Sequence, residues 1–456
     1  MSFATINPAT GRRVRRYRPD RPAEVTAALR RAEAAQRSWR GVPPARRARC
    51  LRRVASVLRK RRDEFASLIT LEMGKPLGQA RAEIEKSAAV CAYYAKNGPR
   101  FLADEFPAGA AKNVRVGFEP VGLVLAIMPW NFPFWQVFRA AAPALMAGNA
   151  VLLKHSENVC GCARAIAEIF RAAAAPGERG LLQTLLIPTG RIPALIADPR
   201  VQGVTLTGST GAGKHVAALA GAAMKKGVFE LGGSDPYLIL ADADLDQAAE
   251  VCAQARLGNA GQSCISAKRF IVVAKVHRAF QAKFAARLQA RRVGDPLDPA
   301  TDMGPMARRD LRDALHRQVR ASVKAGARLV FGGHPMAGPG FYYPPTLLTA
   351  VKKGMPAYSE ELFGPVAALI AVRGEAEAIA VANDSIYGLG AAVFSRDRRR
   401  ARKVAARLEA GTVFINAQVR SDQAVPFGGI KQSGHGRELG LFGIREFVNV
   451  KTIRVA

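Results

Sequence analysis

Hydrophobic positions along this chain follow two different periods, and the changes between them predict where helices and strands lie. The first hundred residues show a strand-like opening and then long amphipathic helices, with breaks at 43–44 and 98–99, where proline occurs in both dipeptides. A period of two follows over 114–118 and again over 121–125, on either side of a Glu-Pro break. We predict two short strands here, which together are too short to form a domain.

From residue 121 onward, short apolar segments alternate with amphipathic ones. The pattern predicts strands over 150–154 and 201–206, and helices over 162–174 and 212–223. A second alternating region runs from about 235 to 427, and 446–455 alternates again as a final strand. Strands that alternate with helices are typical of a doubly wound parallel sheet, so the predicted fold class is α/β.

The composition is that of a globular protein in a reducing compartment. Of 456 residues, 49% are hydrophobic and 23% charged, and no apolar run reaches the ~20 residues that a membrane span needs. The chain is long enough for two domains or more. Its six cysteines are sparse, which suits free thiols, and its first residues lack the segments of a secretory signal. We therefore expect a cytoplasmic protein with no membrane partner.

The formal net charge of +32 is unusual, because 68 lysines and arginines stand against 36 acidic residues. Arginine clusters such as 46–49 and 398–400 are compatible with binding to nucleic acid or another polyanion. The alternative is compositional, with arginine accumulated on exposed helix faces. The clusters are scattered and no aromatic-interleaved RNA motif accompanies them, so we favour the compositional explanation and expect no nucleic-acid partner.

Two short segments carry residues suited to covalent catalysis. The segment 259–264, Asn-Ala-Gly-Gln-Ser-Cys, places Cys264 after a flexible polar turn. The segment 230–234, Glu-Leu-Gly-Gly-Ser, places the carboxylate of Glu230 beside two glycines. A thiol and a carboxylate on glycine-hinged loops provide a nucleophile, a base and a backbone that can approach a carbonyl substrate closely.

The remaining cysteines indicate no chemistry of their own. Cys50, Cys91 and Cys252 lie in helical patterns, where a lone cysteine is usually a small buried hydrophobic residue. Cys160 and Cys162 are separated by a single residue and have no His/Cys partner pair, so we predict no metal site.

Two further turns offer polar groups to a ligand. Asn131, in the Pro-Trp-Asn-Phe-Pro sequence of 129–133, can donate a side-chain hydrogen bond to an oxyanion, although a satisfied turn asparagine has the same pattern. The glycine-rich turn 208–213 follows a predicted strand and opens a predicted helix, so its backbone N–H groups suit a pyrophosphate. Its spacing differs from the G-x-G-x-x-G fingerprint.

These segments, in this order and spacing, resemble the aldehyde dehydrogenase superfamily over nearly the whole chain. The segments 230–236, 259–269 and 426–434 are most similar to its NAD(P)-dependent succinate-semialdehyde dehydrogenase branch. The resemblance implies two doubly wound α/β domains and a small β oligomerisation arm. The expected ranges are 1–103 and 121–231 for the NAD-binding domain, 232–439 for the catalytic domain, and 104–120 and 440–456 for the arm.

The resemblance also implies roles for individual residues. Cys264 is the expected nucleophile, and Glu230 is the expected base that activates the water hydrolysing a thioester. The amide of Asn131 and the backbone N–H of Cys264 are the expected oxyanion donors. The residues implied in cofactor binding are Trp130, Lys154, Glu157, Gly208, Ser209, Gly213, Glu361 and Phe363.

Glu157 bears on the choice of cofactor. In the family the lysine matching Lys154 contacts the adenosine ribose, and a glutamate three residues later can accept hydrogen bonds from both ribose hydroxyls and repel a 2′-phosphate. We therefore expect NAD, with NADP possible. A solvent-exposed ion pair between Lys154 and Glu157 is the alternative.

The branch implies a substrate with a distal carboxylate. Arg139, eight residues after Asn131, stands where that branch places a carboxylate-binding arginine and where many relatives acting on apolar aldehydes have an aromatic residue, and Ser421 matches a second carboxylate-binding position. Some members have another arginine where this chain has Gly258, so the carboxylate clamp is weaker or Arg420 supplies the missing charge. Succinate semialdehyde is the leading substrate, followed by glutarate semialdehyde or another ω-carboxy aldehyde.

The expected reaction is oxidation of the aldehyde through a cysteine thiohemiacetal and thioester, in a homodimer or homotetramer. The alternative from another class is a catalytically minor protein that keeps the fold and binds a polyanion.

Overall fold

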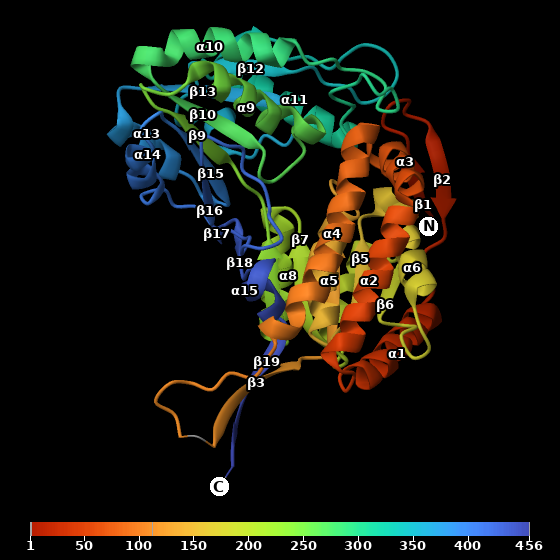
Figure 1. Ribbon diagram of the computed structural model, residues 1–456. Helices are drawn as coiled ribbons and strands as arrows, with labels where there is room; N and C mark the ends of the chain where they lie inside the picture. Colours follow the sequence, from red (N-terminus) through yellow and green to blue (C-terminus); the bar gives the residue numbers. More distant parts are fainter. Residues whose placement is uncertain (1, 112, 456) are drawn as a thin grey trace.

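Two α/β lobes and a β arm make up the molecule (Figure 1). The computed structural model describes residues 2–111 and 113–455, and positions 1, 112 and 456 of the expected domain ranges lie outside the described residues. Each lobe contains a largely parallel sheet packed against helices, which confirms the predicted doubly wound α/β class. None of the described helices is long and apolar enough to span a membrane.

The first lobe is built on a six-stranded sheet. Its strands are β4 (Leu123–Met128), β5 (Ala150–His155), β6 (Leu182–Leu185), β7 (Val201–Thr207), β8 (Lys226–Glu230) and β18 (Gly434–His435). Their order is β18-β8-β7-β4-β5-β6, and all pairs are parallel except β18 with β8. Every residue of β4 and β5 is buried, as expected for parallel strands covered on both faces. The strands predicted over 150–154 and 201–206 are thus confirmed, and β18 joins this sheet although it lies within 232–439.

Helices cover this sheet, and an N-terminal hairpin lies beside them. The hairpin is β1 (Phe3–Ile6) with β2 (Arg13–Tyr17), and the helices are α1 (Pro22–Trp39), α2 (Pro44–Lys60), α3 (Arg62–Met73), α4 (Leu77–Phe101), α5 (Trp135–Met146), α6 (Cys160–Ala173), α7 (Ile192–Ala197), α8 (Thr210–Ala222) and α15 (Gly440–Arg445). Helix α5 packs on β4 and β5, is covered by α2 and α4, and is buried along its whole length.

The break predicted at 98–99 is wrong, because Pro99 lies inside the last turn of α4. A Cβ on Gly98 would lie 2.3 Å from the side chain of Met146, so α4 and α5 are in direct contact there. Packing of this kind outweighs the single backbone hydrogen bond that a proline removes near a helix end. The break predicted at 43–44 does separate α1 from α2.

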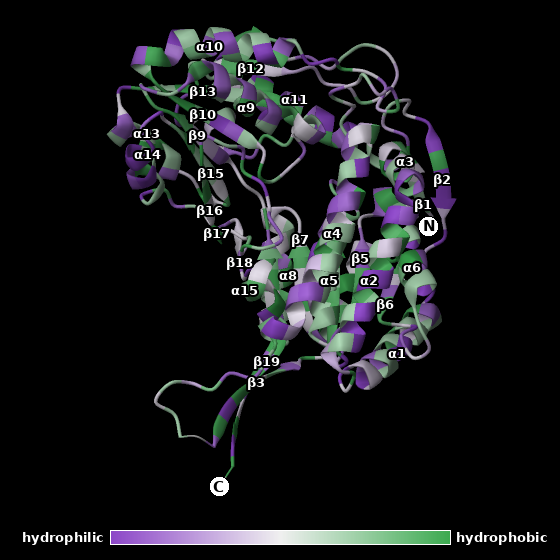
Figure 2. Cartoon of the chain, viewed as in Figure 1, coloured by the Kyte–Doolittle hydropathy of each residue, from purple (hydrophilic) through white to green (hydrophobic). Residues whose placement is uncertain are grey.

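The second lobe is built on a seven-stranded sheet. Its strands are β9 (Asp235–Ile239), β10 (Ala267–Val273), β11 (Arg328–Phe331), β12 (Thr346–Thr349), β13 (Val366–Val372), β15 (Gly390–Phe394) and β16 (Thr412–Ile415), in the order β11-β12-β13-β10-β9-β15-β16. Its helices are α9 (Leu245–Leu257), α10 (Ala274–Gln289), α11 (Arg309–Lys324), α12 (Pro356–Ser359), α13 (Glu375–Asn383) and α14 (Arg398–Ala405). Alternate residues of β9 belong to two different hydrophobic cores, so both faces of the sheet are covered. Figure 2 shows the hydrophobic strands inside and hydrophilic positions on the outer helices.

A two-stranded arm projects from the lobes at the bottom of Figure 1. It consists of β3 (Val114–Pro120) paired antiparallel with β19 (Val448–Arg454), which confirms the strands predicted over 114–118 and 446–455. A smaller pair, β14 (Tyr387–Gly388) with β17 (Ile430–Lys431), lies apart from both large sheets. The chain crosses between the lobes after β8, since β9 begins five residues after Glu230.

Candidate active site

The predicted catalytic and cofactor residues follow the carboxyl ends of strands in the first sheet. Asn131 comes after β4, Ser209 comes after β7, and Glu230 is the last residue of β8. Ligands bind at this edge in open α/β folds, because the carboxyl ends of parallel strands meet there. The short connection from β8 to β9 brings the second lobe to the same edge, so the site lies between the lobes.

Two cavities meet at Cys264, which lines both of them. The first has a volume of about 230 Å³, and we call it the cofactor-side cavity. Its lining includes Trp130, Asn131, Gly208, Ser209, Glu361 and Phe363. The second has a volume of about 190 Å³, and we call it the substrate-side cavity. Its lining includes Glu83, Lys86, Trp135, Arg139, Ser421 and Phe427.

The loop before Cys264 has an unusual backbone. Asn259, Ala260 and Gly261 have φ angles of 54°, 52° and 70°, all in the left-handed region. This conformation costs a non-glycine residue about 1–2 kcal/mol, so the loop needs anchors. A Cβ at position 261 would lie 2.3 Å from the carbonyl oxygen of Gly364, which makes glycine necessary there.

Buried polar side chains provide these anchors. The guanidinium of Arg256 donates to the carbonyl of Gly261 at 2.6 Å. The amide of Asn259 donates to the carbonyls of Asn131 at 2.9 Å and Gln262 at 3.1 Å. The turn expected to be flexible is therefore buried and tied to both lobes, which fixes the position of the thiol.

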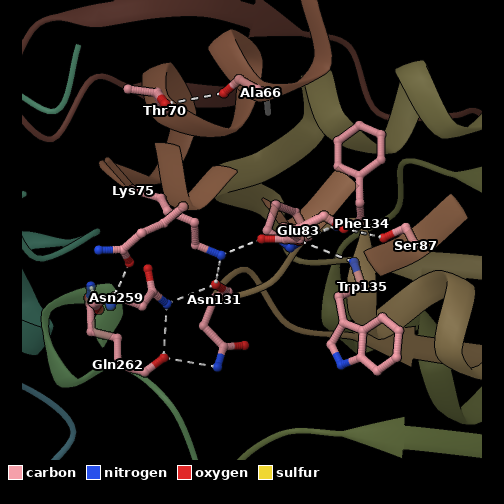
Figure 3. Close-up of polar contacts among 12 residues, drawn as sticks. Ala66, Thr70, Lys75, Glu83, Ser87, Asn131, Phe134, Trp135, Asn259 and Gln262 are labelled. Carbon is pink, nitrogen blue, oxygen red and sulfur yellow. Dashed lines mark hydrogen bonds and ion pairs between the residues drawn. The ribbon is translucent and has the colours of Figure 1, made fainter. Parts of the chain in front are cut away.

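Asn131 belongs to the buried hydrogen-bond network drawn in Figure 3. Its Nδ2 donates to the carbonyl of Gln262 at 3.1 Å, and its backbone carbonyl accepts from Lys75 Nζ at 2.9 Å. Lys75 also pairs with Glu83, whose carboxylate accepts from the backbone N–H groups of 134–135 at the start of α5. An amide nitrogen carries two N–H groups, so Asn131 retains one for an oxyanion in the cofactor-side cavity.

The Cys264 thiol is desolvated and lies near several charges. Burial raises its pKa to about 12, Arg139 and Lys268 oppose this increase, and Glu230 and Glu361 add to it. Lys268 Nζ donates to two carbonyl oxygens of the loop, at 3.0 and 2.8 Å, and lies 3.7 Å from the Glu361 carboxylate. The thiol is therefore protonated at neutral pH in this state, and its attack on a carbonyl requires a base.

Glu230 is completely surrounded by protein close to this thiol. Neither of its carboxylate oxygens has a hydrogen-bond partner among the described residues. Burial raises its pKa well above the usual value, Glu438 adds to the shift, and Arg139 and Arg437 oppose it. Arg139 also forms a buried ion pair with Glu438. A carboxyl group that has a raised pKa and interacts electrostatically with the Cys264 thiol has the properties of a general base.

The N-terminus of α8 forms a cradle for an anion. Ser209 caps the helix, since its hydroxyl accepts from the N–H of Ala212 at 3.3 Å. A Cβ on Gly213 would lie 2.2 Å from the side chain of Leu231, so glycine lets α8 approach the loop after β8. The N–H of Gly208 donates to the carbonyl of Glu230 at 3.0 Å. Because this N–H already has a partner, Gly208 shapes the turn rather than donating to an anion. Free N–H groups and the helix dipole at such an end suit a pyrophosphate.

Of the remaining predicted cofactor residues, Trp130, Glu361 and Phe363 line the same cavity, while Lys154 and Glu157 are not part of its lining. The rings of Trp130 and Phe363 meet edge to face, with centroids 5.9 Å apart. Glu361 accepts from a backbone N–H of the loop after β8 at 3.0 Å. Lys154 Nζ lies 3.9 Å from the carboxylate of Glu157, whose side chain is 43% exposed. The ion pair between Lys154 and Glu157, which was the alternative to a cofactor contact, is thus present. The Glu157 carboxylate is nevertheless exposed enough to meet solvent or a ligand.

The substrate-side cavity contains both predicted carboxylate-binding residues. Arg139 is buried, and its charge is already paired with Glu438. The hydroxyl of Ser421 accepts from Lys86 Nζ at 2.7 Å. Arg420, the expected source of a missing charge, is exposed to solvent.

Lys86, Lys268 and Glu438 are site residues that sequence reasoning missed. Lys86 lies on an amphipathic helix without any motif around it, and its position follows only from where α4 passes the cavity. Lys268 lies within the segment 259–269 and Glu438 lies four residues after the segment 426–434, so a charged residue in or near a recognised motif was the available signal.

A cysteine between a helix-terminal anion cradle and a polar pocket is the arrangement of a nucleotide-dependent oxidoreductase that works through a covalent cysteine adduct. The model of the aldehyde dehydrogenase family matches residues 1–453, and the chain belongs to that family. The resemblance seen in the sequence is confirmed.

Relatives of known name match over essentially the whole length. The chain is 50% identical over 456 residues, 100% of both chains, to a Synechocystis sp. protein named "Probable succinate-semialdehyde dehydrogenase" with NADP(+). It is 47% identical over 449 residues, 98% of this chain and 97% of the relative, to an Escherichia coli succinate semialdehyde dehydrogenase named for NAD(P)+. The crystal structure of succinic semialdehyde dehydrogenase from Streptococcus pyogenes with NADP+ has a TM-score of 0.96 at 37% identity, covering 99% of each chain.

Proposed function

We propose that this protein oxidises an ω-carboxy aldehyde, with succinate semialdehyde as the leading substrate and NAD or NADP as the oxidant. The observation that carries the proposal is the position of Cys264, which lines one cavity beside an anion cradle and a second cavity that contains two cations. The relatives described above are named for the same substrate. Glutarate semialdehyde, which is longer by one methylene, is the alternative substrate for the same cavity.

The residues divide the reaction between them. Glu230 takes the proton of the Cys264 thiol, and the thiolate sulfur adds to the aldehyde carbon to form a thiohemiacetal. The Asn131 amide and the Cys264 N–H donate to the resulting oxyanion, and each such donor contributes about 2.7–4 kcal/mol to transition-state stabilisation. The bound nicotinamide dinucleotide supplies the hydride acceptor that converts the adduct to a thioester. Once Glu230 has released the thiol proton to solvent, it takes a proton from water as the water oxygen adds to the thioester carbon; the C–S bond then breaks to give the acid, and a proton returns to the sulfur to restore the thiol.

The cavity residues fit a dinucleotide. Trp130 and Phe363 offer aromatic faces and edges to a flat ring, Glu361 offers a carboxylate to ribose hydroxyls, and Ser209 stands at the anion cradle. Glu157 supports NAD in this proposal because a carboxylate repels a 2′-phosphate, while the names of the relatives include NADP(+).

A panel of aldehydes assayed with both cofactors tests this function. Succinate and glutarate semialdehyde are compared with butanal and pentanal, and NADH or NADPH formation is followed by absorbance. The proposal requires a kcat/KM for the carboxylated aldehydes well above that for their uncharged counterparts. Equal values would refute the carboxylate preference, and salt-sensitive RNA binding without any cofactor reduction would favour the polyanion-binding alternative.

The proposal extends to assembly and location. The arm formed by β3 and β19 projects from the lobes (Figure 1), which supports a homodimer or homotetramer in which the arm contacts a second copy. The sparse free cysteines support a cytoplasmic protein. Light scattering of the purified protein tests the first statement, and a monomer at micromolar concentration would contradict it.

A further inference from the structure

Two of the charged side chains in the substrate-side cavity already have partners of opposite charge. Glu83 pairs with Lys75 and accepts two backbone hydrogen bonds at 2.9 and 3.1 Å. Arg139 pairs with Glu438, and both residues are buried. Neither charge is left uncompensated for a ligand.

Lys86 differs from both. Its Nζ donates to the Ser421 hydroxyl at 2.7 Å and lies 4.1 Å from the centre of the Trp135 ring. No described carboxylate forms an ion pair with it. The ammonium group is therefore held in place by a hydroxyl and an aromatic face, which orient a cation without neutralising it.

The charges that face Lys86 come from three parts of the fold. Glu83 lies on the same helix, Arg139 on α5, and Arg420 and Asp422 on the segment before β17. The pKa of Lys86 is lowered to about 8, chiefly by burial and then by Arg139 and Arg420, while the two carboxylates oppose the shift. Lys86 is thus mostly protonated at neutral pH and gains from a nearby anion.

We propose that Lys86, together with the Ser421 hydroxyl, binds the distal carboxylate of the aldehyde, while Arg139 stays paired with Glu438. The inference rests on the proposed function and deepens it, since it assigns specificity to a residue outside the expected clamp. Substrate binding gives Lys86 the carboxylate partner that it lacks, in a desolvated pocket where a charge-assisted hydrogen bond is stronger than in water.

The test compares two lysines of one helix. Lys86→Met removes the cavity cation, and Lys96→Met removes an exposed cation from the same α4 helix as a matched control. The measured quantity is the ratio of kcat/KM for succinate semialdehyde to that for butanal. We expect this ratio to fall by at least ~10-fold in Lys86→Met, to stay within about twofold of wild type in Lys96→Met, and to recover in large part in Lys86→Arg.

Binding of the product gives a second readout that does not depend on turnover. Titration calorimetry with succinate should show an affinity at least ~10-fold weaker for Lys86→Met than for wild type. An unchanged ratio and an unchanged succinate affinity would overturn the proposal, as would a ratio that collapses in an Arg139 variant but not in Lys86→Met. Failure of the proposed function looks different, because wild type itself would then show no preference for the carboxylated aldehyde.

Discussion

Replacing Arg139 by methionine tests whether this arginine holds the site together or binds substrate. Its guanidinium is 2% exposed, pairs with Glu438 and lies close to the carboxylate of Glu230. Methionine has similar length and no charge, so the variant leaves two buried carboxylates without their shared cation. If Arg139 is structural, turnover of charged and uncharged aldehydes should fall together.

The magnitude follows from the burial of the pair. Breaking a buried ion pair by removing one partner costs about 3–5 kcal/mol, because the remaining charge is left uncompensated in the interior. Removing both charges, with Arg139→Met and Glu438→Leu combined, should restore most of this loss and give a coupling energy of about 2–3 kcal/mol. The double variant should remain somewhat less stable than wild type, because the Glu230 carboxylate still lacks the cation of Arg139.

The sign of the pH dependence follows from the raised pKa values of the two carboxylates. A carboxyl group whose folded-state pKa exceeds its unfolded value destabilises the fold increasingly as pH rises from the unfolded toward the folded pKa. The deficit of Arg139→Met should therefore be larger at about pH 7.5 than at about pH 5.5.

Urea unfolding followed by tryptophan fluorescence measures these quantities for wild type, both single variants and the double variant. A deficit below about 1 kcal/mol for Arg139→Met, or a double variant no more stable than that single variant, would refute the account of a buried structural pair. Selective loss of succinate semialdehyde turnover, with stability intact, would restore Arg139 to the carboxylate clamp that the sequence suggested.

Three further predictions concern the chemistry and the cofactor. Cys264→Ala should reduce NADH formation to below roughly a few per cent of wild type while cofactor binding, measured by fluorescence titration, persists; greater residual turnover would exclude a covalent nucleophile at this position. Glu157→Ser should raise the kcat/KM ratio of NADP to NAD by about tenfold or more, since it removes a carboxylate that repels a 2′-phosphate, and a constant ratio would assign Glu157 to its ion pair with Lys154 alone. The KM for succinate semialdehyde should rise as pH increases through about 8, the pKa of Lys86, while the KM for butanal stays flat; parallel pH profiles for both aldehydes would argue against charge recognition by this lysine.

Local pattern was sufficient to predict much of the fold and to recognise the candidate catalytic motifs. The runs at 150–154 and 201–206 are strands because they carry enough apolar side chains to be covered on both faces, a property of the segment itself. The segments around Cys264, Glu230 and Asn131 are recognisable for a similar reason. Each combines a reactive side chain with a glycine- or proline-defined turn, and that combination is written in neighbouring residues.

Contacts between distant segments decided the rest. Helix α4 continues through Pro99 because Gly98 packs on α5. Arg139 forms an ion pair with Glu438, which is almost 300 residues away in the sequence. Lys86 reaches the cavity only because α4 crosses it beside Ser421. Which partner a charged side chain meets depends on distances in space, and hydrophobic periodicity records only which face of an element is buried. The sequence alone therefore determined the class of chemistry, while the tertiary structure decided which cations of the cavity are paired with carboxylates of the protein.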